Sequence, residues 1–350
     1  MKEGIRIKKY DKLERLLGEL ACGCGCGVTG AENGAAQAAA GILSALMPAQ
    51  IDALGNVRGE AEGEGPRILL DAHIDSIGMV VTAVGEDGFL KADKCGGVDI
   101  RVLPASEVNV WGKERLFGVI TSVPPHLSGD KDGQAPGFDQ LTIDTGLGSR
   151  AKELVEPGDR ISLAGKGMQM TGKLYCAPAL DDRAGVACIL RCLELLKKSG
   201  RSYNLSVLFS VQEESGGSGA AVGAFSSQAE EGISVDVSFA CAPGIPREKC
   251  GELGKGPMIG IAAPLDGETG VRLRTTAKSK GIPYQLEAMG GKTGTNADEL
   301  SVSGEGMKIG LISIPLRNMH TAAEIVSLED IENAAALMAA YIAERGRNDA

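Results

Sequence analysis

The chain has 350 residues, a formal net charge of −10 at pH 7 and a hydrophobic content of 43%. This length suits one large domain or two, and the negative charge excludes a basic nucleic-acid-binding surface. No apolar stretch reaches the about 18 residues that a transmembrane helix requires, and the charged, amphipathic first residues do not resemble a signal peptide, so we expect no membrane partner.

The first elements along the chain are predicted to be helical. An amphipathic helix is expected over about residues 9–20 and a second, more apolar helix over about residues 33–47. Between them, Cys22, Cys24 and Cys26 alternate with glycine, unlike the Cys-x-x-Cys pattern of structural zinc sites, and we interpret them as a turn of small residues. The 9 cysteines, several inside apparent core segments, indicate a reducing, cytoplasmic location.

The middle of the chain is predicted to form β-strands. "RILLDAHID" (67–75) predicts a short buried strand that ends in polar residues. From about residue 77 to 170, short alternating segments such as "VNVWG" and "RISLAG" are separated by Gly, Pro and Asp. Such a pattern is typical of a small antiparallel β unit.

Helices and strands alternate again after residue 170. The sequence predicts a helix from "AGVACILRCLELLKKSG", strands over 204–211, 233–240 and 308–316, a helix from "TGVRLRTTAKSKGIP" and a closing helix from "SLEDIENAAALMAAYIAERG". We therefore expect an α/β domain formed by 1–76 and 171–350, with a mixed sheet between two helical layers and an inserted, barrel-like all-β domain at 77–170.

Metal-ligand side chains follow several of the predicted strands. They are His73 and Asp75, Asp181 and Asp182, Glu213 and Glu214, and His320. Ligands gather at the carboxyl ends of strands in α/β sheets, so we expect these side chains to meet. Each has an ordinary structural alternative, and Asp182 alone is better explained as a helix N-cap.

Imidazoles and carboxylates together suit a zinc- or cobalt-type divalent site. The number of acids indicates two metals that share a carboxylate bridge. One of the two adjacent glutamates would then bind a metal, while its neighbour takes a proton from the activated water. Asp75 lies two residues after His73, on the same strand face, and is placed to orient the imidazole.

Four motifs closely resemble the tetrahedral aminopeptidases, a family of co-catalytic metallopeptidases of glutamyl or leucyl type whose members are sometimes labelled cellulase or endoglucanase. The motifs are "DAHIDSIGMVV", "PALDDRAG", "VQEESGGSGA" and "ISIPLRNMHTAAE", and they occur in the family's order along nearly the whole chain. The resemblance implies that His73 binds the first metal with Asp75 orienting it, that Asp181 bridges both metals, that Glu213 is the general base, and that Glu214 and His320 bind the second metal.

The resemblance also implies an assembly. Members of the family form dimers through the inserted β domain, and the dimers build a hollow tetrahedral dodecamer that admits unfolded peptides. We therefore expect a homo-oligomer with peptide substrates and no nucleic-acid partner.

The chain departs from the family pattern at the remaining ligand of the first metal. The family has an aspartate just before Pro-Gly, and here Cys241 stands at that position in "DVSFACAPG". Cys241 is either a substitute ligand or a small buried residue beside a weakened first site. Asp236 lies earlier in the same strand and matches a separate family aspartate. Asn296 and Asn318 also replace residues common in the family.

These features predict a metal-dependent aminopeptidase that hydrolyses N-terminal residues from peptides through a metal-activated water. One alternative is a related metal-dependent amidohydrolase or deacylase. Another is a catalytically weakened homologue retained for assembly or peptide binding, which Cys241 motivates. A preference for acidic N-terminal residues would require a basic side chain near the pocket, and Arg317 is the candidate by its proximity to His320.

Overall fold

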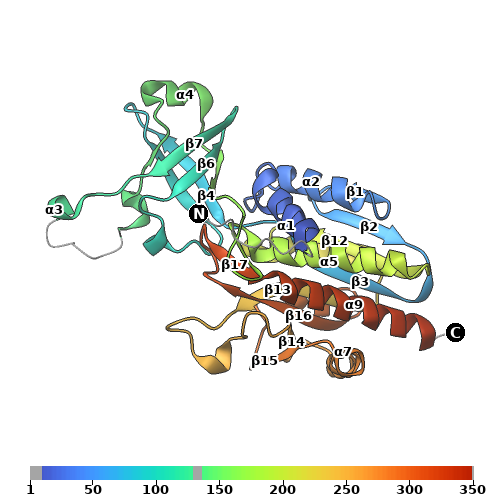
Figure 1. Ribbon diagram of the computed structural model, residues 1–350. Coiled ribbons are helices and arrows are strands. Elements are labelled where there is room, and N and C mark those ends of the chain that lie inside the picture. Colours follow the sequence, from blue (N-terminus) through green and yellow to red (C-terminus); the bar gives the residue numbers. More distant parts are fainter. Residues whose placement is uncertain (1–9, 129–135, 349–350) are drawn as a thin grey trace.

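The computed structural model describes residues 10–128 and 136–348 (Figure 1). It contains an 11-stranded mixed sheet between helical layers and a separate closed barrel, which stands to one side of the sheet (Figure 1). The predicted fold class, a three-layer α/β domain with an inserted all-β barrel, is therefore confirmed. Residues 1–9, 129–135 and 349–350 of the predicted domain ranges lie outside the described residues.

The main sheet has the strand order β1-β2-β12-β3-β13-β16-β17-β11-β10, and β14 pairs with both β15 and β16. Its strands are β1 (Ala49–Ile51), β2 (Val57–Ala61), β3 (Glu64–His73), β10 (Met168–Gln169), β11 (Leu174–Ala177), β12 (Tyr203–Ser210), β13 (Glu231–Phe239), β14 (Met258–Ile261), β15 (Gln285–Ala288), β16 (Lys308–Arg317) and β17 (Glu324–Ser327). The central strands β12, β3, β13 and β16 run parallel. Their carboxyl ends therefore meet at one edge of the sheet.

Helices cover both faces of this sheet. They are α1 (Asp11–Gly18), α2 (Asn33–Leu43), α5 (Leu180–Lys198), α6 (Ser218–Ser227), α7 (Gly267–Lys280), α8 (Ala297–Ser301) and α9 (Leu328–Asn348). Alternate residues of β3 serve the two layers, because Leu70 and Ala72 pack with α5 and α9 while Leu69 packs with α6 and α8. The second predicted helix ends at Leu43, short of residue 47, and turn residues connect it to Pro48.

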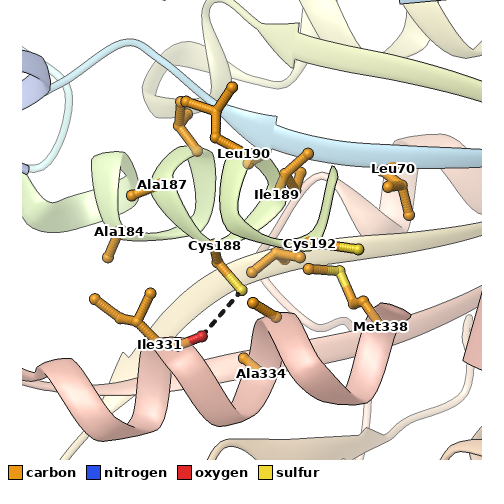
Figure 2. Close-up of a cluster of buried hydrophobic side chains, with 14 of the residues drawn as sticks. Leu70, Ala184, Ala187, Cys188, Ile189, Leu190, Cys192, Ile331, Ala334 and Met338 are labelled. Atoms are coloured by element: carbon orange, nitrogen blue, oxygen red, sulfur yellow. Dashed lines mark hydrogen bonds between the residues drawn. The ribbon is translucent and has the colours of Figure 1, made fainter. Parts of the chain in front are cut away.

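Figure 2 shows the packing of α5 on α9. The thiol of Cys188 lies 3.6 Å from the carbonyl oxygen of Ile331, and Cys192 and Met338 fill the space beside it (Figure 2). Leu190 and Ile189 of the same helix are also fully buried. Burial of an aliphatic side chain of this size contributes about 1.5–3 kcal/mol, so this layer fixes the start of α5, where Asp181 lies.

The barrel consists of β4 (Gly78–Val84), β5 (Leu90–Cys95), β6 (Glu107–Trp111), β7 (Arg115–Ile120), β8 (Ile143–Asp144) and β9 (Arg160–Leu163), closed in the order β4-β5-β8-β7-β6-β9. The short helices α3 (Pro125–Ser128) and α4 (Ala151–Leu154) flank it. It has its own core, in which Val108, Val110 and Ile161 are completely buried. Strand β10, which follows the barrel, already pairs within the main sheet.

The cysteine-glycine segment follows α1. A π-helical turn at Glu19–Gly23 contains Cys22, and the chain then leaves the helix at Cys24. All cysteines in the described ranges have free thiols. Among the described residues, no helix combines the length and the apolar character that spanning a bilayer requires.

Candidate metal centre

Ligand-type side chains from distant segments meet at the carboxyl edge of the parallel strands. His73 ends β3, Asp181 lies at the start of α5, and Asp236 lies in the last part of β13. Glu214 lies in a 3₁₀ turn that follows β12, and His320 lies just after β16. Within the described ranges, these five side chains form two groups whose ligand atoms all lie within 4.8 Å of one another.

The first group contains His73, Asp181 and Asp236, all three of them buried. The His73 Nε2 atom lies 3.0 Å from Asp181 Oδ1 and 3.9 Å from Asp236 Oδ1. This group therefore offers one imidazole nitrogen and two carboxylate oxygens at a single point.

The second group contains Asp181, Glu214 and His320. The His320 Nε2 atom lies 3.2 Å from Asp181 Oδ2 and 3.2 Å from Glu214 Oε1. Asp181 thus turns one carboxylate oxygen to each imidazole. It is the residue that the two groups share.

The donor set fits divalent cations. Zinc binds nitrogen and oxygen ligands at about 2.0–2.1 Å in a tetrahedron, which separates neighbouring ligand atoms by about 3.3 Å. The separations around His73 Nε2 are 3.0 and 3.9 Å, and both separations around His320 Nε2 are 3.2 Å. A mixture of imidazole and carboxylate ligands suits zinc and its neighbours among the transition metals.

The charges of the site also indicate a cation. Burial, together with the nearby carboxylates Glu214 and Asp181, raises the pKa of Glu213 to about 7 although His73 opposes the rise. Burial also raises the pKa of Asp236 well above its usual value. For His320, burial lowers the pKa, but hydrogen bonds to Asp181 and Glu214 outweigh this and raise it to about 11. The site therefore carries more negative charge than its own groups balance.

Asp75 contacts the side of the His73 ring opposite to the first ligand group. Its Oδ1 atom lies 3.3 Å from His73 Nδ1, the ring nitrogen that faces away from Asp181. The same carboxylate accepts hydrogen bonds from the backbone N–H groups of Glu213 (3.1 Å) and Glu214 (3.2 Å). One buried carboxylate therefore positions an imidazole and the turn that carries both glutamates, which extends the orienting role predicted for it.

Glu324 was not singled out from the sequence. It is fully buried, and it accepts hydrogen bonds from the backbone N–H groups of Asp181 (3.1 Å) and His320 (2.7 Å). Burial and the nearby Asp181 carboxylate together raise its pKa to about 8, against the effect of the two hydrogen bonds. The available signal was its position four residues after His320 in "HTAAE".

The barrel also contributes to the site. His320 has a positive φ of 64° and its Nδ1 atom lies 2.9 Å from the carbonyl oxygen of Gly97, in the loop after β5. A Cβ atom on Gly97 would lie only 2.7 Å from that nitrogen, so the close approach requires glycine. The inserted unit therefore helps to orient a side chain of the main domain.

Cys241 belongs to neither group of ligand atoms. It lies two residues beyond the end of β13, and its thiol interacts with Cys250. Its carbonyl oxygen accepts a hydrogen bond of 2.8 Å from Arg317. Asp236, which the sequence comparison had assigned to a separate position, occupies the third place beside His73 and Asp181. The signal for it was an acid inside an otherwise apolar strand.

The two asparagines that depart from the family pattern lie behind or beside the site. Asn296 is buried, and its amide donates hydrogen bonds to Asp71 (3.1 Å) and to Ser210 (2.7 Å). An amide there avoids a second carboxylate facing the completely buried Asp71. Asn318 donates to the carbonyl oxygen of Ala323 (3.1 Å) and so stays within the loop that carries His320.

Two hollows reach the ligand groups from different directions. One has a volume of about 360 Å³ and is lined by Glu213 and by residues of β13, β15 and β16. The other is narrower and runs towards the barrel, where Trp111 and Arg115 line it. Glu213 faces the wider hollow without belonging to either ligand group. The arrangement combines two candidate metal-ligand groups, a carboxylate outside both groups and a cavity with room for a small organic group.

Comparisons with known proteins identify the family of the chain. Residues 55–337 match the M42 glutamyl aminopeptidase family. The chain is 32% identical over 303 residues to the lysyl aminopeptidase of Pyrococcus furiosus, a match that covers 84% of this chain and 86% of that protein.

Solved structures give the same result. An aminopeptidase of the archaeon Desulfurococcus kamchatkensis superposes with a TM-score of 0.87 and 30% identity over 97% of both chains. The TET1 peptidase of Pyrococcus horikoshii, which can assemble into a tetrahedron or a large octahedral shell, superposes with a TM-score of 0.82 and 29% identity. That match covers 94% of this chain and 98% of the other.

Proposed function

The chain belongs to the M42 glutamyl aminopeptidase family and is a metal-dependent aminopeptidase, and we propose that its two ligand groups each hold one divalent cation. The resemblance predicted from the motifs is thereby confirmed at the level of the family. The observation that carries the proposal is the position of Asp181, with one oxygen towards each imidazole at 3.0 and 3.2 Å. Zinc and cobalt are the cations that we favour for this donor set.

The proposed ligands divide as the two groups do. His73 and Asp236 would hold the first cation, His320 and Glu214 would hold the second, and Asp181 would be a ligand common to both. When bound, the cations lower the pKa of water and polarise the carbonyl group of the scissile peptide bond. Asp75 and Glu324 keep the ligands in their orientation through the hydrogen bonds described above.

Glu213 is the proposed general base. Its carboxylate lines the same hollow as the ligands and is committed to neither group. In the metal-free chain, burial raises its pKa to about 7, and bound cations would favour the ionised form that a general base requires. It can therefore accept a proton from the attacking water and transfer that proton to the departing amine.

Substitution of Glu213 by Gln tests this role. The variant should keep its metal content, measured by plasma emission spectrometry, because Glu213 is not a ligand. Its turnover of an amino acid p-nitroanilide should fall by about 10²–10⁴-fold, the range that general-base catalysis contributes. Glu248→Gln is a suitable control, since Glu248 is an exposed acid outside this hollow. Near-normal turnover in Glu213→Gln would remove Glu213 from the base role.

The alternatives can be separated by substrate. A deacylase releases amino acids from acylated precursors, whereas the proposed aminopeptidase requires a free N-terminal amine. The alternative of a weakened homologue depends on Cys241 standing where the family has an aspartate ligand. Asp236 lies beside His73 and offers a carboxylate to the first group. Near two metal ions per chain with peptidase turnover would support the proposal.

We also propose that the chain assembles into a homo-oligomer, a tetrahedral dodecamer built from dimers. The TET1 peptidase, which can form a tetrahedron, is similar over 94% of this chain. The barrel region, which we assign to residues 77–170, exposes Phe117 (57%) and Leu127 (70%), apolar side chains that a dimer contact would cover. Light scattering coupled to size-exclusion chromatography tests this, since a dodecamer has twelve times the chain mass of 36.1 kDa.

A further inference from the structure

Glu287, on β15, lines the wide hollow beside the metal centre without belonging to either ligand group. We propose that its carboxylate selects peptides whose N-terminal residue has a cationic side chain, lysine or arginine. This inference rests on the proposed aminopeptidase function and names the substrate class of that same site.

Two serines hold this carboxylate next to the metal centre. Glu287 Oε1 accepts a hydrogen bond from Ser238, and Oε2 accepts one of 2.7 Å from Ser313. Ser238 lies two residues after Asp236 on β13 and therefore faces the same side of the sheet. Ser313 is the register partner of Asp236 on β16. Both serines thus place Glu287 about one side chain away from the first ligand group.

The carboxylate has no cationic partner of its own. In the described part of the chain, no lysine or arginine forms an ion pair with Glu287, and none lines the wide hollow; Lys249 and Lys292 line the adjoining surface hollow that Glu287 also borders. A carboxylate has about four lone-pair positions, and the two serine hydroxyl groups occupy two of them. Positions therefore remain for the ammonium or guanidinium group of a substrate, which would meet a fixed negative charge.

The walls of the hollow suit the stem of such a side chain. Phe239, Met289 and Leu311 line it together with Glu287. The methylene groups of lysine or arginine can pack on these apolar side chains while the charged end reaches the carboxylate. An apolar wall with a single fixed charge at its end discriminates by charge as well as by size.

An acidic N-terminal residue would meet the opposite environment. Arg317, the basic candidate from the sequence, instead donates a hydrogen bond of 2.8 Å to the carbonyl oxygen of Cys241 and does not line this hollow. The family description and the lysyl relative carry names for opposite charges. We therefore choose between an acidic and a basic N-terminal residue from the side chains that line the hollow.

The test compares lysine with norleucine, which has the same unbranched stem but no ammonium group. Steady-state kcat/KM is measured for the p-nitroanilides of lysine, arginine, norleucine and glutamate, with the zinc- or cobalt-loaded full chain. The wild type should prefer lysine over norleucine by about 10-fold or more. Glu287→Gln should lower kcat/KM for lysine by about 10–100-fold and leave norleucine within about threefold.

Controls separate selection from general damage. Glu305→Gln, an exposed acid that lines neither hollow, should leave every ratio unchanged, and Glu287→Asp should retain a lysine preference. An equal fall for lysine and norleucine in Glu287→Gln would overturn the inference, because Glu287 would then serve the α-amine or the fold. A wild-type preference for norleucine or glutamate over lysine would overturn it without any variant. Inactivity of the wild type on all four substrates would instead contradict the aminopeptidase function.

Discussion

The two ligand groups share Asp181 but differ in burial. In the first group, the His73 side chain is 2% exposed, whereas in the second the His320 side chain is 27% exposed. His73 and Asp236 lie on central parallel strands of the main sheet. Glu214 and His320 lie on turns that follow strands, and His320 depends on a positive φ and on the barrel residue Gly97.

This difference separates a rigid half of the centre from an adaptable half. Strands fixed by a packed core hold their side chains within narrow limits, while loops have fewer buried contacts and open more easily. We therefore expect the group of His73 and Asp236 to hold its cation more tightly. The group of Glu214 and His320 should exchange its cation more readily and adjust to the substrate.

Asp181→Asn should have the largest effect, because it damages both halves at once. Loss of the shared charge removes a ligand from each group, and several kcal/mol of transition-state stabilisation correspond to about 10³-fold or more in kcat. Metal analysis should show less than one ion per chain. Retention of two ions in this variant would show that the halves do not depend on a common ligand.

His73→Ala and His320→Ala should separate the two halves. Both should lose about 10²-fold or more in activity, but added imidazole and excess metal should partly restore only His320→Ala, whose site is open to solvent. His73→Ala should also unfold at a lower temperature, since Asp75, Asp181 and Asp236 would lose their buried partner. Rescue of His73→Ala alone would reverse the proposed order of rigidity.

In the chelated, metal-free protein, thermal stability should decrease as the pH rises. The folded-state pKa of Glu213 is raised from 4.5 to about 7, and that of Glu324 from 4.5 to about 8, both mainly by burial. That of His320 is raised from 6.5 to about 11, since its hydrogen bonds to Asp181 and Glu214 outweigh the opposing effect of burial. The folded chain then binds more protons than the unfolded chain, so the free energy of unfolding decreases with pH.

Protonated His320 stabilises the folded state fully below pH 6.5, and this stabilisation is lost towards pH 11. Ionisation of Glu213 and Glu324 destabilises the folded state from about pH 4.5, and this destabilisation is complete above about pH 8. Calorimetry of the chelated protein between about pH 5 and pH 9 should therefore show a decreasing Tm. Added zinc should flatten this slope, since the cation replaces the protons. A Tm that rises with pH in the chelated protein would contradict these shifts.

Cys241→Ala should have the smallest effect, because Cys241 lies outside both halves. Metal content and kcat/KM should stay within about twofold of the wild type, while Asp236→Ala should lose metal from the rigid half. Both quantities can be measured on the same preparations. A loss of metal in Cys241→Ala comparable to that in Asp236→Ala would make the thiol a ligand after all.

Much of the fold could be predicted because its signals are local. The apolar runs that form β3, β12, β13 and β16 and the helical periodicity of α5 are visible in short windows of sequence. His73, Glu214 and His320 could be singled out because polar ligands directly follow such runs. Where strands are parallel, their ends share an edge, so adjacency followed from topology.

The third ligand of the first group was harder to predict. Asp236 lies inside β13, where an acid is a poor match to a buried strand, while Cys241 stands beside a turn signal that the motif uses as an anchor. The choice depends on which side chain faces the edge of the sheet next to His73. Glu324 and Glu287 were missed for the same reason, since each acts through contacts with residues distant in the chain.

The amino-acid order by itself determined the layers, the inserted barrel and most of the candidate metal ligands, because propensity, periodicity and motif spacing are properties of neighbouring residues. Only the tertiary structure decided that Asp236 rather than Cys241 lies beside His73, that Gly97 of the barrel contacts His320, and that Glu287 lines the hollow. These choices depend on strand register and on which faces oppose one another across the sheet. No local pattern encodes a contact between side chains that only the folded chain brings together.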